Sequence, residues 1–312
     1  MILPPLASAD DIEKIARNIL IGARAFGKFP TPVDDLIAYS ELSLAKGIDL
    51  SEVEPSLITA GRMFAGKVSR KVLGIFDFRD KTIYIDHSQR ESRKNFVKLH
   101  ETGHGVISWQ KDLIGCLDDE DTVAPEIKEE FEREASFFAS AGLFQLERFE
   151  EEAANLPLSL RSARALGEKF GGSAQAAIRR YVERSPNRCA LLVLHPLERN
   201  GGVHARVRNY FESPSFTKAF GGLAWPGECG WDFPFVKDMQ FKKREHIKGL
   251  ITTTTPSLET LSLEYHYFDS TYNVFVFLFP AGEKNKSRVT ILPAQSHATS
   301  QRARRRPARG VT

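Results

Sequence analysis

The spacing of apolar residues is mainly helical up to Pro186 and mainly strand-like beyond it. Apolar positions that recur every three or four residues predict amphipathic helices. They place such helices at residues 8–27, 33–46, 88–107 and 125–152. Ser88 and Glu91 have the spacing of a capping box before the third helix, and Pro125 suits the first turn of the fourth.

Strand patterns precede the third helix. Residues 73–78 and 81–86 alternate in polarity and predict a hairpin with its turn at Arg79 and Asp80. Residues 62–64 predict a further strand. The hairpin leads directly into the helix at 88–107, so the two are expected to pack together.

A helical hairpin is predicted at residues 158–184. A short helix is followed by a turn at Gly171 and Gly172, a cap at Ser173 and a second helix, which is the order of a helix-turn-helix. The second helix is expected to expose polar side chains suited to phosphate or base contacts, namely Gln175, Arg179, Arg180 and Arg184. Most short helical hairpins only pack, so this pattern alone does not indicate DNA binding.

Residues 187–293 predict a sheet with one buried face, because apolar and aromatic residues alternate with polar ones. The expected strands are residues 189–197 and 203–216, a hairpin at 262–280 and a last strand at 287–293, with helical pieces at 216–220 and 239–248. The histidines of this region show no metal-ligand spacing and are expected to be structural: His195, His204, His246 and His266. Residues 294–312 are polar and basic, which predicts a disordered tail.

The strongest chemical signal is the sequence His-Glu-x-x-His at His100, Glu101 and His104. Side chains four residues apart lie on one face of a helix, so the two histidines can bind one metal ion. Zinc held by two histidines and a carboxylate keeps a position for water, and Glu101 beside it can act as general base. This is the pattern of a metallopeptidase.

The third metal ligand is expected on the helix at 125–152. Glu132 is favoured, because its helical phase leaves the apolar residues around it for the core and because the small Ala135 allows close packing against the histidine helix. Glu134, two residues further on, is the rival ligand. Ser136 would then be available to orient a ligand by a hydrogen bond. Alternatively, both glutamates are solvated charges of an acidic helix.

Composition restricts the cellular setting. The 312 residues, 42% hydrophobic and 27% charged, suit a soluble protein of two or three domains. The net charge of +3 includes five arginines of the tail, so the rest is close to neutral and gives no argument for nucleic acid. Three widely spaced cysteines indicate a reducing compartment. No run reaches the roughly 18 apolar residues of a membrane span, so we expect a cytoplasmic protein with no membrane partner.

Two stretches carry a family resemblance: HETGHGVISWQ, with Gly103, Gly105 and the Trp109-Gln110 pair, and EREASFFASAGLFQ, with its Glu-x-x-Ala phrase. With the acidic loop from Cys116 between them, they resemble the ImmA/IrrE family of zinc metallopeptidase-like proteins, especially the IrrE branch of radiation- and stress-response regulators. Ser136 departs from the family, which commonly has Asn or Asp there.

The resemblance implies an α+β multidomain protein. The expected parts are a zincin-like metallopeptidase domain at residues 1–155, a helix-turn-helix-like segment at 156–186, a mixed α/β GAF-like sensor domain at 187–293 and the tail at 294–312. It implies His100, His104 and Glu132 as zinc ligands and Glu101 as the catalytic base. Manganese or iron could replace zinc at such a site.

The resemblance also implies a function. The expected activity is a zinc-dependent endopeptidase that cleaves a protein substrate, a helix-turn-helix transcriptional repressor, to switch on a stress response such as that to DNA damage. The alternative is a non-catalytic regulator that binds DNA or a transcription factor and whose metal site is structural or vestigial.

Overall fold

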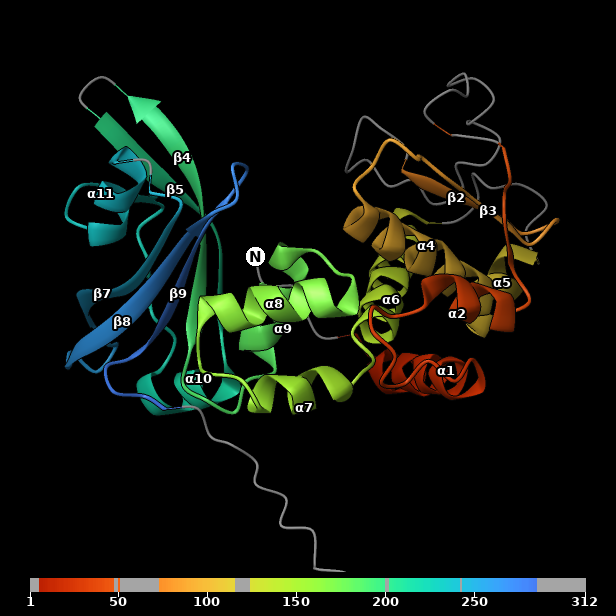
Figure 1. The fold of residues 1–312 in the computed structure, drawn as a ribbon, viewed down its shortest axis with the longest axis horizontal. Helices are drawn as coiled ribbons and strands as arrows, with labels where there is room; N and C mark the ends of the chain where they lie inside the picture. Colours follow the sequence, from red (N-terminus) through yellow and green to blue (C-terminus); the bar gives the residue numbers. More distant parts are fainter. Residues whose placement is uncertain are drawn as a thin grey trace, which may run out of the picture.

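The computed structural model describes residues 6–47, 50, 73–115, 124–199, 202–241 and 243–284. The chain forms two lobes, one mainly helical and one built on a large sheet, with the helices of residues 148–183 between them (Figure 1). The fold is therefore of mixed α and β type, as the sequence predicts. Among the described residues, no helix is both long and apolar enough to cross a bilayer. The predicted strands at 62–64 and 287–293, the tail, and residues 116–123 of the acidic loop lie outside the described residues.

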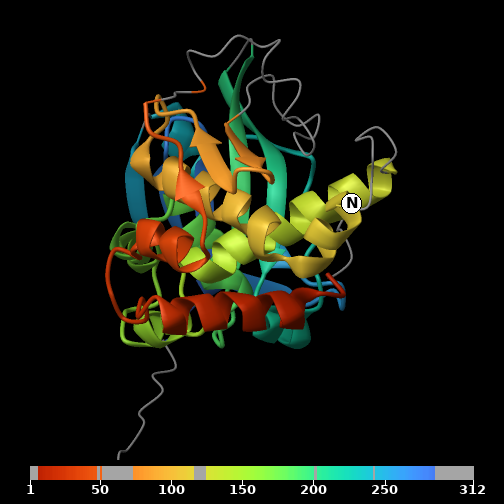
Figure 2. The ribbon, with the colours of Figure 1, turned by 90° about the vertical axis from the view of Figure 1, so that its right-hand side faces the viewer.

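The helical lobe combines five described helices with a small sheet. The helices are α1 Ala9–Gly22, α2 Val33–Tyr39, α4 Glu91–Val106, α5 Ser108–Gly115 and α6 Pro125–Leu143. Helix α1 runs along the base of the lobe (Figure 2). The described strands are β1 Ser43–Leu44, β2 Gly74–Asp77 and β3 Thr82–Ile85, in the order β1-β3-β2. The β2–β3 hairpin is antiparallel and stands where the sequence predicts it.

Helix α4 begins without the predicted capping box. Its N-cap is Arg90, with no capping hydrogen bond from a side chain. Ser88 instead donates its hydroxyl and its backbone N–H to Asp86 Oδ1. The aspartate at the end of the hairpin thus holds Ser88 in a turn before the helix, and an Asx turn of this kind competes with capping.

The predicted helix at 125–152 is two helices in the structure. Helix α6 ends at Leu143, Gln145 and Leu146 have positive φ angles of 52° and 53°, and α7 spans Arg148–Ala154. The buried amide of Gln145 accepts from Gly27 N at 2.8 Å and donates to Lys28 O at 2.8 Å. These bonds to the α1–α2 loop hold the break in place, and helical periodicity alone could not show them.

Helices α8 Leu160–Phe170 and α9 Ala174–Glu183 form the predicted helical hairpin. Gly171 ends α8 with φ of 79°, and the Ser173 hydroxyl caps α9 by accepting from Ala176 N. The expected exposure of Arg180 is wrong. Its side chain is only 12% exposed and pairs with Glu150 at 3.0 Å, because α9 packs over α7.

The second lobe is an antiparallel sheet of strands β4 Ala190–Arg199, β5 Gly202–Glu212, β6 Glu228–Cys229, β7 Glu245–Thr254, β8 Thr260–Asp269 and β9 Val274–Pro280. The strand order is β6-β5-β4-β9-β8-β7, so the first and last long strands are neighbours at the centre. Helix α10 Pro214–Phe220 agrees with the predicted helical piece at 216–220. The helix expected at 239–248 is wrong, since α11 Pro234–Gln240 ends early and β7 follows.

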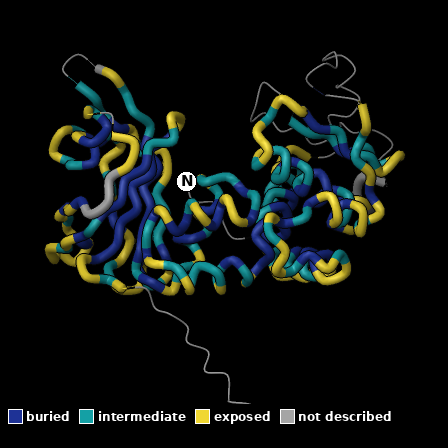
Figure 3. Tube along the Cα trace, viewed as in Figure 1, coloured by how far each residue is buried: buried dark blue, intermediate teal, exposed yellow. Residues whose placement is uncertain are grey.

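The expectation of one buried face is also wrong for the central strands. All seven residues of β9 are buried. Phe275, Phe277 and Phe279 pack with α7–α9, whereas Val274 and Val276 face the core of α10 and α11. The centre of the sheet is buried throughout (Figure 3). A continuous apolar run such as VFVFLF is typical of a strand covered on both faces.

Candidate metal centre

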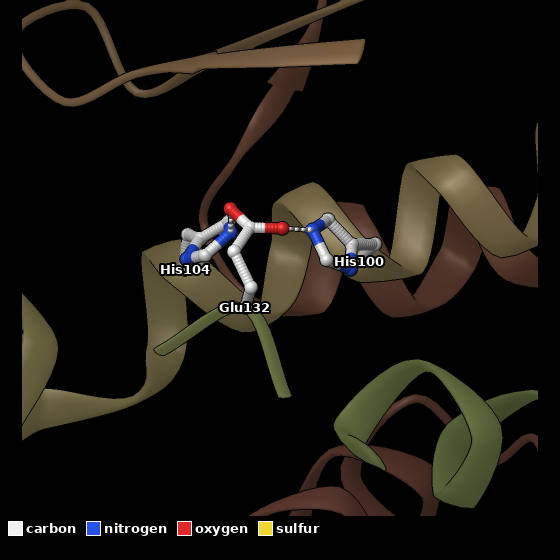
Figure 4. Close-up of side chains that lie close together, drawn as sticks. All are labelled: His100, His104 and Glu132. Atoms are coloured by element: carbon white, nitrogen blue, oxygen red, sulfur yellow. Dashed lines mark ion pairs between the residues drawn. The ribbon is translucent and has the colours of Figure 1, made fainter. Parts of the chain in front are cut away.

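The structure brings His100, His104 and Glu132 together. Glu132 Oε2 lies 3.2 Å from His100 Nε2, and Glu132 Oε1 lies 3.5 Å from His104 Nε2. The glutamate carboxylate stands between the two imidazole rings (Figure 4). One donor atom from each residue falls within 4.8 Å of the others, the arrangement of a group that could hold a metal ion. Within the described part of the chain, no other group of this kind occurs.

Close packing of α4 on α6 produces this convergence. A Cβ built on Gly103 would lie only 3.0 Å from Ala135 Cα, so the two backbones touch at this point. Leu99 and Phe138, one turn away on the two helices, are buried in the same core. On α4, His100 lies one turn before Gly103 and His104 directly follows it. On α6, Glu132 lies one turn before Ala135. The helix contact therefore sets the distance between the ligands.

A buried hydrogen-bond network lies behind His104. Gln110 Oε1 is 2.8 Å from His104 Nδ1, and Gln110 Nε2 donates to Glu134 Oε2 at 2.7 Å and to the Phe131 carbonyl at 3.2 Å. Trp109 Nε1 also donates to Glu134 Oε2, at 2.9 Å. Glu134 thus faces away from the ligand group and anchors the residues that support His104.

His100 has a weaker support. Ser136 Oγ lies 3.3 Å from His100 Nδ1, so the serine stands at the second nitrogen of that ring, where the sequence predicts it. The contact is long and only partly buried. The two histidine ligands are therefore held to different degrees.

The electrostatics of the group are those of a carboxylate held between two imidazoles. Burial alone would raise the pKa of Glu132, but hydrogen bonds from His100 and His104 outweigh burial and lower that pKa to about 2. Burial alone would lower the pKa of His104, but the hydrogen bond to Glu132 and the charges of Glu101 and Glu132 raise it. Glu132 is therefore an ionised acceptor that a metal ion could use as a ligand.

Glu101 lies beside this group and is almost completely buried. Burial raises the pKa of its carboxyl above the ordinary value of 4.5, against the opposing effect of the nearby histidines. Strand β2 lies over this side chain, because a Cβ built on Gly74 would lie 2.7 Å from Glu101 Oε1. The carboxylate is thus confined between α4 and the start of β2. A buried carboxyl with a raised pKa holds an accepted proton more readily than an exposed one does.

The donor set fits a divalent transition metal. Two imidazole nitrogens and one carboxylate oxygen are the protein ligands of catalytic zinc sites that keep an open position. Gln110 occupies the Nδ1 side of His104, which leaves Nε2 on the side of Glu132. The set does not discriminate between zinc, manganese and iron.

The structure places each residue predicted for the site, and it adds two that sequence reasoning did not assign. Gln110 was noted only for its family resemblance, and Glu134 only as a rival ligand. The signal for Glu134 was its spacing: two residues beyond Glu132, it points to another side of α6. No signal in the sequence places Gln110, because it lies on α5, after the break at Ile107, whose ψ angle of 103° ends α4.

Comparison with known proteins adds family evidence. Residues 66–181 match the family model described as the IrrE N-terminal-like domain, peptidase M78. No curated protein matches the chain. A solved structure described as "Mycobacterium tuberculosis transcriptional regulator" is similar in fold, with a TM-score of 0.50 and 13% identity over 86% of this chain and 75% of that one. The family match spans both helices of the ligand group. Residues 66–181 of this chain are therefore similar to the IrrE N-terminal-like domain of peptidase family M78.

Proposed function

We propose that this protein is a cytoplasmic zinc-dependent endopeptidase that cleaves a protein substrate. The observation that carries the proposal is the convergence of His100, His104 and Glu132 with the buried Glu101 beside them. The match of residues 66–181 to the IrrE N-terminal-like domain of peptidase M78 supports it. Manganese or iron in place of zinc would leave the chemistry unchanged in kind.

In this mechanism His100, His104 and Glu132 hold the metal ion. When bound, the ion supplies Lewis-acid activation of water and of the scissile carbonyl. Glu101 accepts the proton that water loses as it attacks the carbonyl carbon. Glu101 then donates this proton to the leaving amide nitrogen as the C–N bond breaks. Its raised pKa suits both steps, because the carboxyl can hold the proton between them.

The substrate we propose is a helix-turn-helix transcriptional repressor whose cleavage switches on a stress response, such as that to DNA damage. The resemblance of HETGHGVISWQ and EREASFFASAGLFQ to the IrrE branch supports this substrate. The similar mycobacterial structure is described as a transcriptional regulator, which is consistent with a role in gene control.

We also propose that residues 1–155 form the peptidase domain, 156–186 a helix-turn-helix-like segment and 187–293 a GAF-like sensor domain. An antiparallel sheet with helices on both faces supports the third assignment. The helical hairpin α8–α9 supports the second, although its core is continuous with that of the sheet through residues such as Tyr181 and Phe277.

The deciding experiment compares wild type with Glu101→Gln. Both proteins are loaded with zinc and mixed with repressors encoded near the gene, and products are identified by mass spectrometry. We expect wild type to cleave one repressor and Glu101→Gln to retain zinc but to lose cleavage by about 10²- to 10⁴-fold, the usual contribution of a general base. Equal cleavage by the two proteins would reject the role of Glu101.

The second candidate is a non-catalytic regulator that binds DNA or a transcription factor. The hairpin α8–α9 favours it, and the packing of Arg180 against Glu150 weighs against DNA contact by that residue. Under this reading, Glu101→Gln would complement a deletion strain as well as wild type does. Under the peptidase reading, it would fail to complement while retaining metal.

A further inference from the structure

The amide of Gln110 has only one orientation that satisfies its surroundings. It is fully buried and meets three polar atoms. Two of them, Glu134 Oε2 at 2.7 Å and the Phe131 carbonyl at 3.2 Å, are acceptors. The NH₂ group must face these two oxygens, because turning the amide over would place its carbonyl against both of them. The carbonyl oxygen therefore faces His104.

This orientation determines which nitrogen of neutral His104 carries the proton. Gln110 Oε1 can only accept, and it lies 2.8 Å from His104 Nδ1. The hydrogen bond forms only if Nδ1 is protonated. A neutral imidazole has one N–H, so Nε2 then has its lone pair, on the side of Glu132 and His100. The opposite tautomer would give up the 2.8 Å hydrogen bond to Gln110 and direct its N–H toward Glu132 Oε1, which lies 3.5 Å from Nε2, a longer contact.

Glu134 is in turn held by residues from two other helices. Trp109 Nε1 on α5 donates to Oε2 at 2.9 Å, and Ser8 Oγ, at the start of α1, donates to Oε1 at 2.5 Å. The carboxylate is 4% exposed. These bonds keep Glu134 in place to receive the Gln110 amide.

We propose that Gln110, oriented by Glu134, is a positioning residue that keeps His104 in its Nδ1–H tautomer and so prepares Nε2 to bind the metal. The proposal rests on the proposed metal site, and it adds the reason why His104 presents an unprotonated nitrogen to the metal. Among the described residues, the side chain at His100 Nδ1 is Ser136, whose hydroxyl can donate or accept and therefore imposes no tautomer. The two ligands are thus prepared unequally.

The first measurement needs no metal. Long-range ¹H–¹⁵N correlation spectra of ¹⁵N-histidine-labelled, metal-free protein at alkaline pH report the tautomer of each neutral imidazole, and His104→Gln identifies the signal of His104. We expect Nδ1–H in wild type and a mixture of tautomers in Gln110→Leu. A wild-type His104 in the Nε2–H form would overturn the proposal whatever the variants do.

The second measurement is zinc affinity by competition with a chromophoric chelator. We expect Gln110→Leu to bind zinc about 10- to 100-fold more weakly, the usual cost of losing an outer hydrogen bond to a ligand. Ser136→Ala serves as the matched control and should change affinity much less. Unchanged affinity and tautomer in a folded Gln110→Leu would reject the proposal.

An exchange of the two residues guards against a misfolded variant. Gln110→Glu alone sets two carboxylates against each other and should weaken zinc binding. The double variant Gln110→Glu with Glu134→Gln restores a single charge and an acceptor facing Nδ1, but it sets that acceptor against the Phe131 carbonyl and the new amide against Trp109 Nε1, so it should recover only part of the affinity. A double variant no better than Gln110→Glu would contradict the proposal. If wild type binds no metal, the proposed function fails, and the tautomer measurement alone decides this inference.

Discussion

Gly103 on α4 contacts the backbone of Ala135 on α6. A Cβ atom added at position 103 would lie only 3.0 Å from Ala135 Cα. The contact joins the helix of the two histidines to the helix of Glu132. Neither atom belongs to a flexible side chain, so an added methyl group must move one helix away from the other. The helix contact and the metal group are thus coupled by geometry.

Gly103→Ala should therefore weaken zinc binding and destabilise the protein by about 1–3 kcal/mol, the usual cost of overpacking. Chelator competition and denaturant unfolding measure the two effects. Gly142→Ala is the matched control at the same interface, because its Cβ would meet Leu99 at an ordinary 3.7 Å. It should leave zinc binding unchanged and gain up to about 1 kcal/mol from helix propensity. Equal behaviour of the two variants would show that the close contact does not set the ligand distances.

Glu132 and Glu134 should differ sharply when each is replaced by glutamine. Glu132→Gln should abolish stoichiometric zinc, because an amide oxygen is a poorer ligand than the carboxylate between the two histidines. Glu134→Gln should keep zinc but bind it less tightly, since Glu134 acts only through Gln110. Metal content by mass spectrometry after dialysis tests both. Loss of zinc from Glu134→Gln but not from Glu132→Gln would show that Glu134, rather than Glu132, is the third ligand.

Stability of the metal-free protein should depend on pH through Glu132 and His104. The pKa of Glu132 is lowered from 4.5 to about 2, so its contribution is complete above about pH 4.5 and lost as the pH falls through about 2. The pKa of His104 is raised above 6.5, so its contribution is complete below pH 6.5 and lost as the pH rises through the folded value. In thermal unfolding, the melting temperature of wild type should exceed that of Glu132→Gln most between about pH 4.5 and pH 6.5. A difference in melting temperature that does not change with pH would contradict the expectation.

The same protonation should oppose metal binding. Zinc requires a neutral imidazole, so protons compete for His104. Because the pKa of His104 is raised, zinc affinity should already fall as the pH approaches 6.5 from above. Chelator competition across this range measures the effect.

Arg180 should matter for stability rather than for DNA. Its guanidinium pairs with Glu150 and donates to the Leu146 carbonyl at 2.7 Å, and both charged side chains are largely buried. Arg180→Ala leaves the Glu150 carboxylate without this partner. The free energy of unfolding should fall by an amount near the lower end of about 3–5 kcal/mol. Arg179→Ala, which breaks an exposed pair with Glu183, should cost only about 0.3–0.5 kcal/mol. Urea unfolding distinguishes the two, and similar costs would contradict the buried role.

Local sequence patterns were sufficient for most helices and strands. Helical spacing predicted α1, α4, α6 and the start of α2, and the residues Gly171 and Ser173 predicted the turn between α8 and α9. The predicted extent of the second helix to residue 46 is wrong, because α2 ends at Tyr39 and Ser43–Leu44 form β1. These features depend on contacts within a few residues, so the sequence expresses them directly. The break between α6 and α7 was missed because Gln145 bonds to Gly27, more than a hundred residues away.

The candidate site shows the same division. The sequence by itself determined that His100 and His104 share a helix face, because four residues make one helical turn. Only the tertiary structure decided which glutamate of α6 faces them, since that depends on the contact of Gly103 with Ala135. It also decided that Gln110 supports His104, because the chain leaves the helical conformation at Ile107 and α5 then brings Gln110 to His104 Nδ1. Periodicity records which face of a helix is buried, whereas the partner of that face is set by packing between helices distant in sequence.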